Sequence, residues 1–100
     1  MAAIYSNTTT AGNTVVLTQP GVDNGNIEKI LVCNRSNNTA LVTFWINRVS
    51  PSRQYYLCKN VSMTAGSSFV LEDNISFDGN IYSLRMLNTG ANPSIDVIIK

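Results

Sequence analysis

The chain contains no histidine, so the commonest general base and metal ligand of proteins is missing. Three of its six acidic residues, Glu72, Asp73 and Asp78, lie close together in the sequence. A carboxylate pair of this kind can hydrolyse a glycosidic bond or hold Ca²⁺. However, Glu-Asp-Asn and Asp-Gly-Asn are also ordinary turn sequences, and we interpret both stretches as turns.

The two cysteines, Cys33 and Cys58, have neither CxxC spacing nor a histidine to complete a zinc site or activate a thiolate. Both fall in strand-like apolar runs, where a free cysteine acts as a small hydrophobe. A disulfide between them is an alternative, although the N-terminus shows no secretory signal and we expect reduced thiols. Phosphate-binding, dinucleotide-binding and serine-hydrolase motifs are absent from the sequence. We therefore predict no enzymatic activity, no metal and no cofactor.

The composition indicates one small globular domain with few charges. Of 100 residues, 44% are hydrophobic and only 13% are charged, whereas Asn, Ser and Thr together account for 32. Such a neutral surface can be covered by another protein at low desolvation cost, although β-turns and exposed strand faces also use these residues. The net charge of +1 and the scattered basic residues argue against nucleic-acid binding. No apolar run approaches the roughly 18 residues of a membrane span.

The stretch Ile27–Arg48 has the strongest hydrophobic pattern. Its two apolar runs, Ile27–Asn34 and Ala40–Asn47, are joined by an Asn- and Ser-rich link, and this arrangement predicts a β-hairpin. Alternation in the second run predicts a core face made of Ala40, Val42, Phe44 and Ile46. Trp45 points to the opposite face, where a loop, the N-terminal segment or a neighbouring subunit could cover it.

Similar short runs, separated by turn signals at roughly ten-residue spacing, follow along the rest of the chain. No segment has a helical period long enough to compete with them. We predict an all-β fold, a single-domain antiparallel β-sandwich of jelly-roll or Ig-like type with about seven or eight short strands. The sandwich would span residues 13–100, and residues 1–12 would form an N-terminal arm.

An exposed strand edge is an aggregation risk unless something covers it. We therefore expect the arm or the final strand to pair with a partner. The candidate interface residues are apolar, aromatic or basic: Ile4, Tyr5, Trp45, Arg53, Tyr55 and Tyr56. Arg48 and Arg53, with the two tyrosines, are the nearest approach to a basic–aromatic patch, which we interpret as a strand end.

Several short motifs resemble those of small structural proteins of tailed bacteriophages, including phages of cyanobacteria. The first is a spaced Ile-Val-Asn-Ser pattern, followed by a Phe-Ile strand that leads to a proline and then by an aromatic strand. The last combines an Ala-Gly turn, a Val-Leu pair and a glycine turn. These motifs fall on Ile30, Val32, Asn34, Ser36, Phe44, Ile46, Pro51, Tyr55, Tyr56, Leu57, Met63, Thr64, Ala65, Gly66, Val70, Leu71, Ile75, Phe77, Asp78, Gly79, Asn80 and Ile81. The chain departs from the family at Gly79-Asn80, where Gly-Asp is usual, and in its last strand.

The resemblance implies a virion component, assembled in the host bacterial cytoplasm, with no catalytic residue to transfer. We expect a decoration or cement protein that binds the major capsid protein in several copies and forms homo-oligomers. A tail, baseplate or fibre-attachment protein is the alternative within this class. From another class, a carbohydrate-binding module would require an exposed aromatic platform, for which Trp45, Tyr55, Tyr56 and Tyr82 are the candidates.

Overall fold

A computed structural model of the chain describes residues 4–19, 21, 25–71 and 74–100. No helix in this part of the chain is long and apolar enough to cross a membrane. The described residues form ten strands, connected only by turns and loops. The strands are β1 (Ile4–Thr8), β2 (Thr14–Val16), β3 (Asn26–Ile27), β4 (Ile30–Asn34), β5 (Ala40–Arg48), β6 (Arg53–Met63), β7 (Ser68–Leu71), β8 (Ile75–Ser76), β9 (Tyr82–Gly90) and β10 (Ile95–Ile99).

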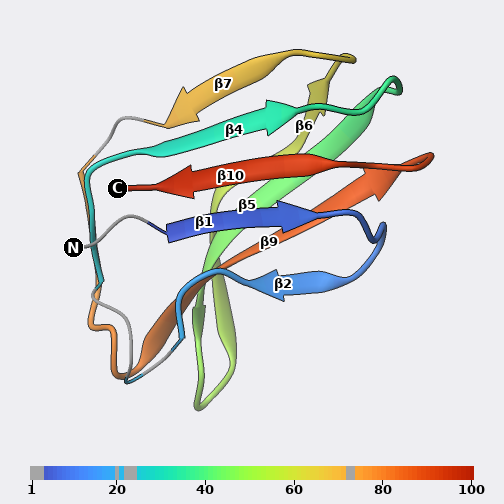
Figure 1. The fold of residues 1–100 in the computed structure, drawn as a ribbon. Coiled ribbons are helices and arrows are strands. Elements are labelled where there is room, and N and C mark those ends of the chain that lie inside the picture. Colours follow the sequence, from blue (N-terminus) through green and yellow to red (C-terminus); the bar gives the residue numbers. More distant parts are fainter. Residues whose placement is uncertain (1–3, 20, 22–24, 72–73) are drawn as a thin grey trace.

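Eight of these strands form two four-stranded antiparallel sheets packed face to face. Sheet A has the order β1-β10-β4-β7 and sheet B has the order β2-β9-β5-β6, while β3 and β8 form a separate pair. Figure 1 shows sheet A in front of sheet B, with the turn of the β5–β6 hairpin at the lower edge of the molecule. The predicted all-β antiparallel sandwich is confirmed.

The strand pairs show which kind of sandwich this is. β1 pairs with β10, β2 with β9, β3 with β8, β4 with β7 and β5 with β6, all antiparallel. The chain is thus one long hairpin whose tip is the β5–β6 turn. It is rolled up so that β10 also pairs with β4, and β9 with β5. This is the jelly-roll topology, and not the Ig-like alternative.

The core lies between the sheets, where alternate residues of each strand point inward. The predicted core face of β5 is confirmed, since Ala40, Val42, Phe44 and Ile46 are all buried. From sheet A, the inner residues of β4 and β10 close the other side of the core. Phe44 meets Phe69 of β7 edge to face, with ring centroids 6.3 Å apart. Each large buried side chain of this kind contributes about 1.5–3 kcal/mol of stability.

The hairpin predicted within Ile27–Arg48 is wrong. β4 pairs with β7 and β10, whereas β5 pairs with β6 and β9, so these consecutive strands lie in different sheets. Residues 35–39 have the composition of a hairpin turn, but the same Asn and Ser chemistry also serves a crossing from one sheet to the other. The two strands bury their apolar faces against each other across the core instead of pairing edge to edge.

A fully buried asparagine, Asn34, anchors this crossing. Its Nδ2 donates hydrogen bonds to the carbonyl oxygens of Asn38 at 2.8 Å, Met63 at 3.0 Å and Thr64 at 3.3 Å. Its Oδ1 accepts from the backbone nitrogen of Ser36 at 3.1 Å and from the Ser36 hydroxyl at 2.7 Å. One side chain therefore connects the β4–β5 crossing to the end of β6.

The backbone completes the same arrangement. The nitrogen of Gly66 donates to the carbonyl oxygen of Asn34 at 2.8 Å, and Gly66 has a φ of 75°, a conformation that glycine adopts without strain. We call the set Asn34, Ser36, Met63, Thr64 and Gly66 the Asn34 corner. It joins the β4–β5 crossing to the β6–β7 turn.

The first dozen residues, predicted to be an N-terminal arm, contribute a strand to sheet A. β1 pairs with β10 in a register that runs from Ile4 opposite Ile99 to Thr8 opposite Ile95. β10 therefore lies between β1 and β4 inside sheet A, whereas β1 is an edge strand, and its pairing with another molecule stays a prediction. Met1–Ala3 lie outside the described residues.

Candidate interaction surface

The structure divides the six candidate interface residues between two places. Trp45, Arg53, Tyr55 and Tyr56 lie on the β5–β6 hairpin of sheet B, whereas Ile4 and Tyr5 lie on β1 of sheet A. These strands belong to different sheets: β1 is an edge strand of sheet A, and β6 is an edge strand of sheet B. There are therefore two surfaces to consider, one on each sheet.

Trp45 lies on the outer face of sheet B and is nevertheless only 5% exposed. Tyr56, opposite it on β6, packs against it with ring centroids 6.0 Å apart and an interplanar angle of 50°. The Nζ of Lys59 lies 5.2 Å from the centre of the Tyr56 ring, a cation–π geometry. Because Tyr56 itself is 49% exposed, the accessible part of this cluster is the tyrosine and the lysine.

Tyr55 points to the opposite face of the hairpin, because neighbouring residues of a strand alternate. It lies opposite Ile46 and packs against Tyr82 of β9, with ring centroids 6.5 Å apart and an interplanar angle of 58°. Arg53 and Arg48 face each other across the same hairpin near its turn. The four aromatic residues proposed as one platform are thus two tilted pairs on two faces.

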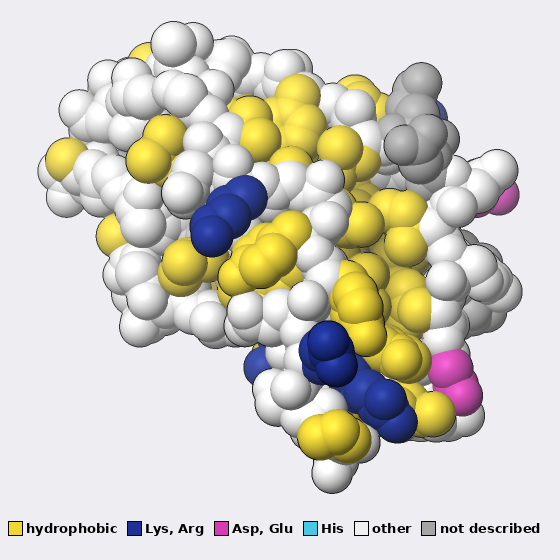
Figure 2. Space-filling view, turned by 180° about the vertical axis from the view of Figure 1, so that it is seen from behind, with side chains coloured by type: hydrophobic (Ala, Val, Ile, Leu, Met, Phe, Trp, Pro, Cys, Tyr) yellow, Lys and Arg dark blue, Asp and Glu magenta, His cyan; other side chains and the backbone are white. Residues whose placement is uncertain are grey.

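The sequence reasoning missed the contribution of Lys59 and Arg85 to this surface. Arg85 lies opposite Trp45 on β9 and its Nε donates to the hydroxyl of Ser83 at 3.1 Å, so its side chain extends along the sheet. One signal was available, since the segments that form sheet B contain four basic residues and no acidic residue. Figure 2 shows this face, with Lys and Arg among hydrophobic side chains and Asp and Glu confined to its margin.

The outer face of sheet A differs from sheet B in its chemistry. The pairing registers place Tyr5, Ile98, Leu31 and Val70 in one apolar row across all four strands. Tyr5 is 74% exposed and Val70 is 44% exposed. Two shallow depressions, of about 380 and 260 Å³, lie along this row, and Ile98 lines both of them. This row is the accessible apolar surface of sheet A.

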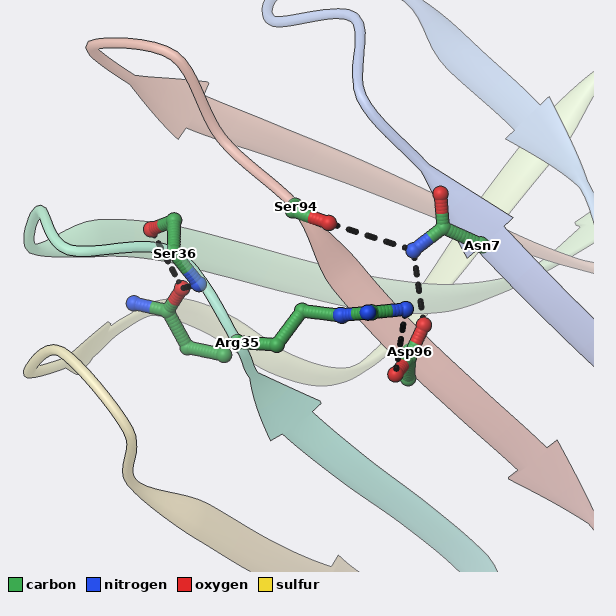
Figure 3. Close-up of polar contacts among 6 residues, drawn as sticks. Asn7, Arg35, Ser36, Ser94 and Asp96 are labelled. Atoms are coloured by element: carbon green, nitrogen blue, oxygen red, sulfur yellow. Dashed lines mark hydrogen bonds and ion pairs between the residues drawn. The ribbon is translucent and has the colours of Figure 1, made fainter.

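A polar cluster lies beside the row, centred on Asp96 (Figure 3). The carboxylate of Asp96 accepts a hydrogen bond from the Nδ2 of Asn7 at 2.6 Å and lies 3.6 Å from a guanidinium nitrogen of Arg35. Asn7 also donates to the hydroxyl of Ser94 at 3.2 Å. The side chains of Arg35 and Asp96 are 61% and 38% exposed, so this pair contributes little to stability.

Both cysteines are free thiols. Cys33 lies beside Asp96 on sheet A, and Cys58 lies on β6 opposite Phe44. Burial raises the pKa of the Cys58 thiol, and a backbone hydrogen bond from Phe44 partly offsets this rise. A raised pKa keeps this thiol protonated and poorly nucleophilic near neutral pH.

The acidic residues considered for chemistry do not assemble in the described part of the chain. Asp78 accepts a hydrogen bond from the backbone nitrogen of Asn80 at 3.0 Å, as a turn residue does, while Glu72 and Asp73 lie outside the described residues. Among residues 4–19, 21, 25–71 and 74–100 there is no group of three or more side chains able to hold a metal ion.

No protein-family model and no curated protein matches this sequence. The surfaces themselves are therefore the guide to function. Of the two, sheet B combines exposed tyrosines with cations that form no ion pair within the described residues, whereas sheet A offers an apolar row beside one ion pair. Both are surfaces suited to association with another molecule.

Proposed function

We propose that this protein is a non-enzymatic structural component of a tailed-phage virion, a decoration protein that binds the major capsid protein on the head in several copies. The Asn34 corner carries the proposal. It brings together residues from two separate motifs that resemble the phage family, the Ile-Val-Asn-Ser pattern and the Ala-Gly turn. Five of the positions that carry the resemblance therefore belong to one structural unit, which supports interpreting the two motifs together.

The topology is a second line of support. Jelly rolls form the domains of viral capsids, and also of lectins and cupins. Because a fold does not by itself assign a function, the surface must discriminate among these classes. Large side chains such as Tyr5, Tyr55 and Tyr56 are about half exposed or more, and tyrosines are enriched where proteins meet.

The carbohydrate-binding alternative would use a flat aromatic platform. Trp45 is buried, and the planes of Trp45 and Tyr56 are inclined by 50°. The second pair, Tyr55 and Tyr82, lies on the other face of the hairpin and is inclined by 58°. This arrangement favours packing against a protein over stacking on sugar rings.

The test is reconstitution on particles. Purified chain carrying a gold-binding tag is added to tailed-phage particles that lack it, with excess untagged chain as the competition control. We expect competable label on the heads, at a saturating number of several copies per head. Label confined to the tails would overturn the head assignment in favour of a tail or baseplate role. The absence of competable label from both would overturn the virion role.

A further inference from the structure

The charges of this chain are segregated between the two sheets. The strands of sheet B contain Arg48, Arg53, Lys59 and Arg85 and no acidic residue. The strands of sheet A contain one acidic residue, Asp96, and no basic residue. For a chain with a net charge of only +1, this is a strong local excess of positive charge.

These cations lack partners within the described part of the chain. The one ion pair among the described residues joins Arg35 to Asp96, on sheet A. Arg48 and Arg53 lie directly opposite each other, and like charges in such positions repel. The Nε of Arg48 is buried and finds no hydrogen-bond partner among the residues that the structure describes. A carboxylate from outside the chain at this hairpin would relieve the repulsion and accept hydrogen bonds from the guanidinium groups.

We propose that the sheet B face and the β5–β6 hairpin form a docking surface for an acidic protein surface, one that presents Asp and Glu carboxylates around an apolar centre. The cations lie among aromatic side chains, with Lys59 over Tyr56 and Arg85 opposite Trp45. Trp, Tyr and Arg are the residues enriched at the energetically dominant positions of protein interfaces. The inference rests on the proposed function, in which the partner is the major capsid protein.

The distribution of the cations favours a protein partner over a nucleic acid. Lys59 and Arg85 flank the outer face, whereas Arg48 and Arg53 face each other at the end of the hairpin. They do not line a single groove that could follow a phosphate backbone. Figure 2 shows Lys and Arg side chains beside hydrophobic ones on this side of the molecule, as in an interface with an apolar centre and charges around it.

The test compares two double variants of the whole chain with the same change in net charge. Arg53→Glu with Lys59→Glu reverses two exposed cations of sheet B, whereas Lys29→Glu with Lys100→Glu reverses two lysines outside that sheet. Urea unfolding checks that both are folded, and Arg53→Gln with Lys59→Gln replaces the reversal variant if it is not. The probes are phage particles lacking the protein, polyglutamate, duplex DNA and vesicles of anionic lipid.

We expect the sheet B reversal to weaken binding to particles and to polyglutamate by about tenfold or more, and the control to stay within about twofold of wild type. Equal binding by wild type and the sheet B variant would overturn the inference while leaving the virion role intact. If wild type does not bind particles, the proposed function fails and the polyglutamate measurement alone tests the inference. Weaker polyglutamate binding by the sheet B reversal variant than by wild type would then support an acidic partner. No polyglutamate binding by wild type, or equal binding by the two chains, would overturn the inference. Tighter binding of DNA or vesicles than of polyglutamate would also overturn it.

Discussion

Replacing Asn34 by alanine is the sharpest test of the jelly-roll corner. The side chain is fully buried, and its amide connects three parts of the chain through five hydrogen-bond contacts. Nδ2 has only two hydrogens for its three acceptors, so the longest contact, 3.3 Å to Thr64, shares a hydrogen with another. About four effective bonds are therefore lost.

The expected cost follows from the location of those bonds. A typical hydrogen bond contributes about 0.5–1.5 kcal/mol net, and a buried group left unpaired costs about 1–3 kcal/mol. The bond to Met63 is buried, whereas those to Ser36 and Asn38 are only partly buried and water can replace them. Asn34→Ala should lower the free energy of unfolding by about 3 kcal/mol, a large fraction of the 5–15 kcal/mol of a typical domain.

Urea unfolding followed by tryptophan fluorescence measures this change. Trp45 is the one tryptophan of the chain and is buried, so its emission reports the folded sandwich. Asn37→Ala removes an exposed asparagine from the same link and should change stability by less than about 0.5 kcal/mol. A cost below about 1 kcal/mol for Asn34→Ala would refute the role assigned to the corner.

Asn34→Asp sharpens the same argument. It keeps the size of the side chain but directs a carboxylate oxygen at three carbonyl oxygens. The cost at neutral pH should be at least that of alanine. Burial against carbonyl oxygens disfavours the carboxylate, so the folded state takes up the proton at a higher pH than the unfolded chain does. Part of the stability should therefore return as the pH falls from neutral toward about 4, because the protonated carboxyl can donate one bond. If the loss of stability in Asn34→Asp does not change with pH, the hydrogen bonds donated by this side chain do not stabilise the corner.

Four further predictions concern other parts of the molecule. Asn88→Val removes two buried polar atoms for which the described residues supply no hydrogen-bond partner, and should raise the free energy of unfolding in urea by about 1 kcal/mol; a lower free energy of unfolding would show that the Asn88 side chain does form hydrogen bonds. Gly25→Ala places a Cβ against a backbone carbonyl oxygen and should cost about 2 kcal/mol or more on the same assay. Burial raises the pKa of Cys58, so the folded state holds this proton more tightly than the unfolded state. Stability should therefore fall as the pH rises through the raised pKa, and Cys58→Ser should show a smaller fall in a urea series. Arg53→Glu places a carboxylate opposite Arg48 and should stabilise the isolated chain by about 0.2–1 kcal/mol, measured by urea midpoint.

The sequence predicts the strands and the core well because both depend on local alternation. Val42, Phe44 and Ile46 are recognisable as one buried face from their spacing alone. Strand pairing was not predictable in the same way. The outermost pair joins Ile4 to Ile99, across nearly the whole chain, and no local pattern specifies such a partner. The β4–β5 link therefore looked like a hairpin when it is a crossing between sheets.

For a related reason, only part of the candidate surface on sheet B could be predicted from the sequence. The β5–β6 hairpin is local, so Arg53 and Tyr55 could be grouped from the sequence. Two irregularities in the register, between Val42 and Trp45 of β5, break the alternation along β6. Strict alternation from Met63 would have placed Lys59 on the inner face, whereas its ammonium group packs on Tyr56 of the outer face.

Arg53 is the position at which stability and docking oppose each other. Two arginines that face each other without a carboxylate partner in the described residues weaken the isolated hairpin. If an acidic partner supplies the missing charge, that cost is recovered on binding. Arg53→Glu should then give a chain that is more stable alone and binds particles more weakly than wild type. A variant that is more stable and binds equally well would show that the arginine pair has no role in docking, and a less stable variant would show that the two side chains do not repel.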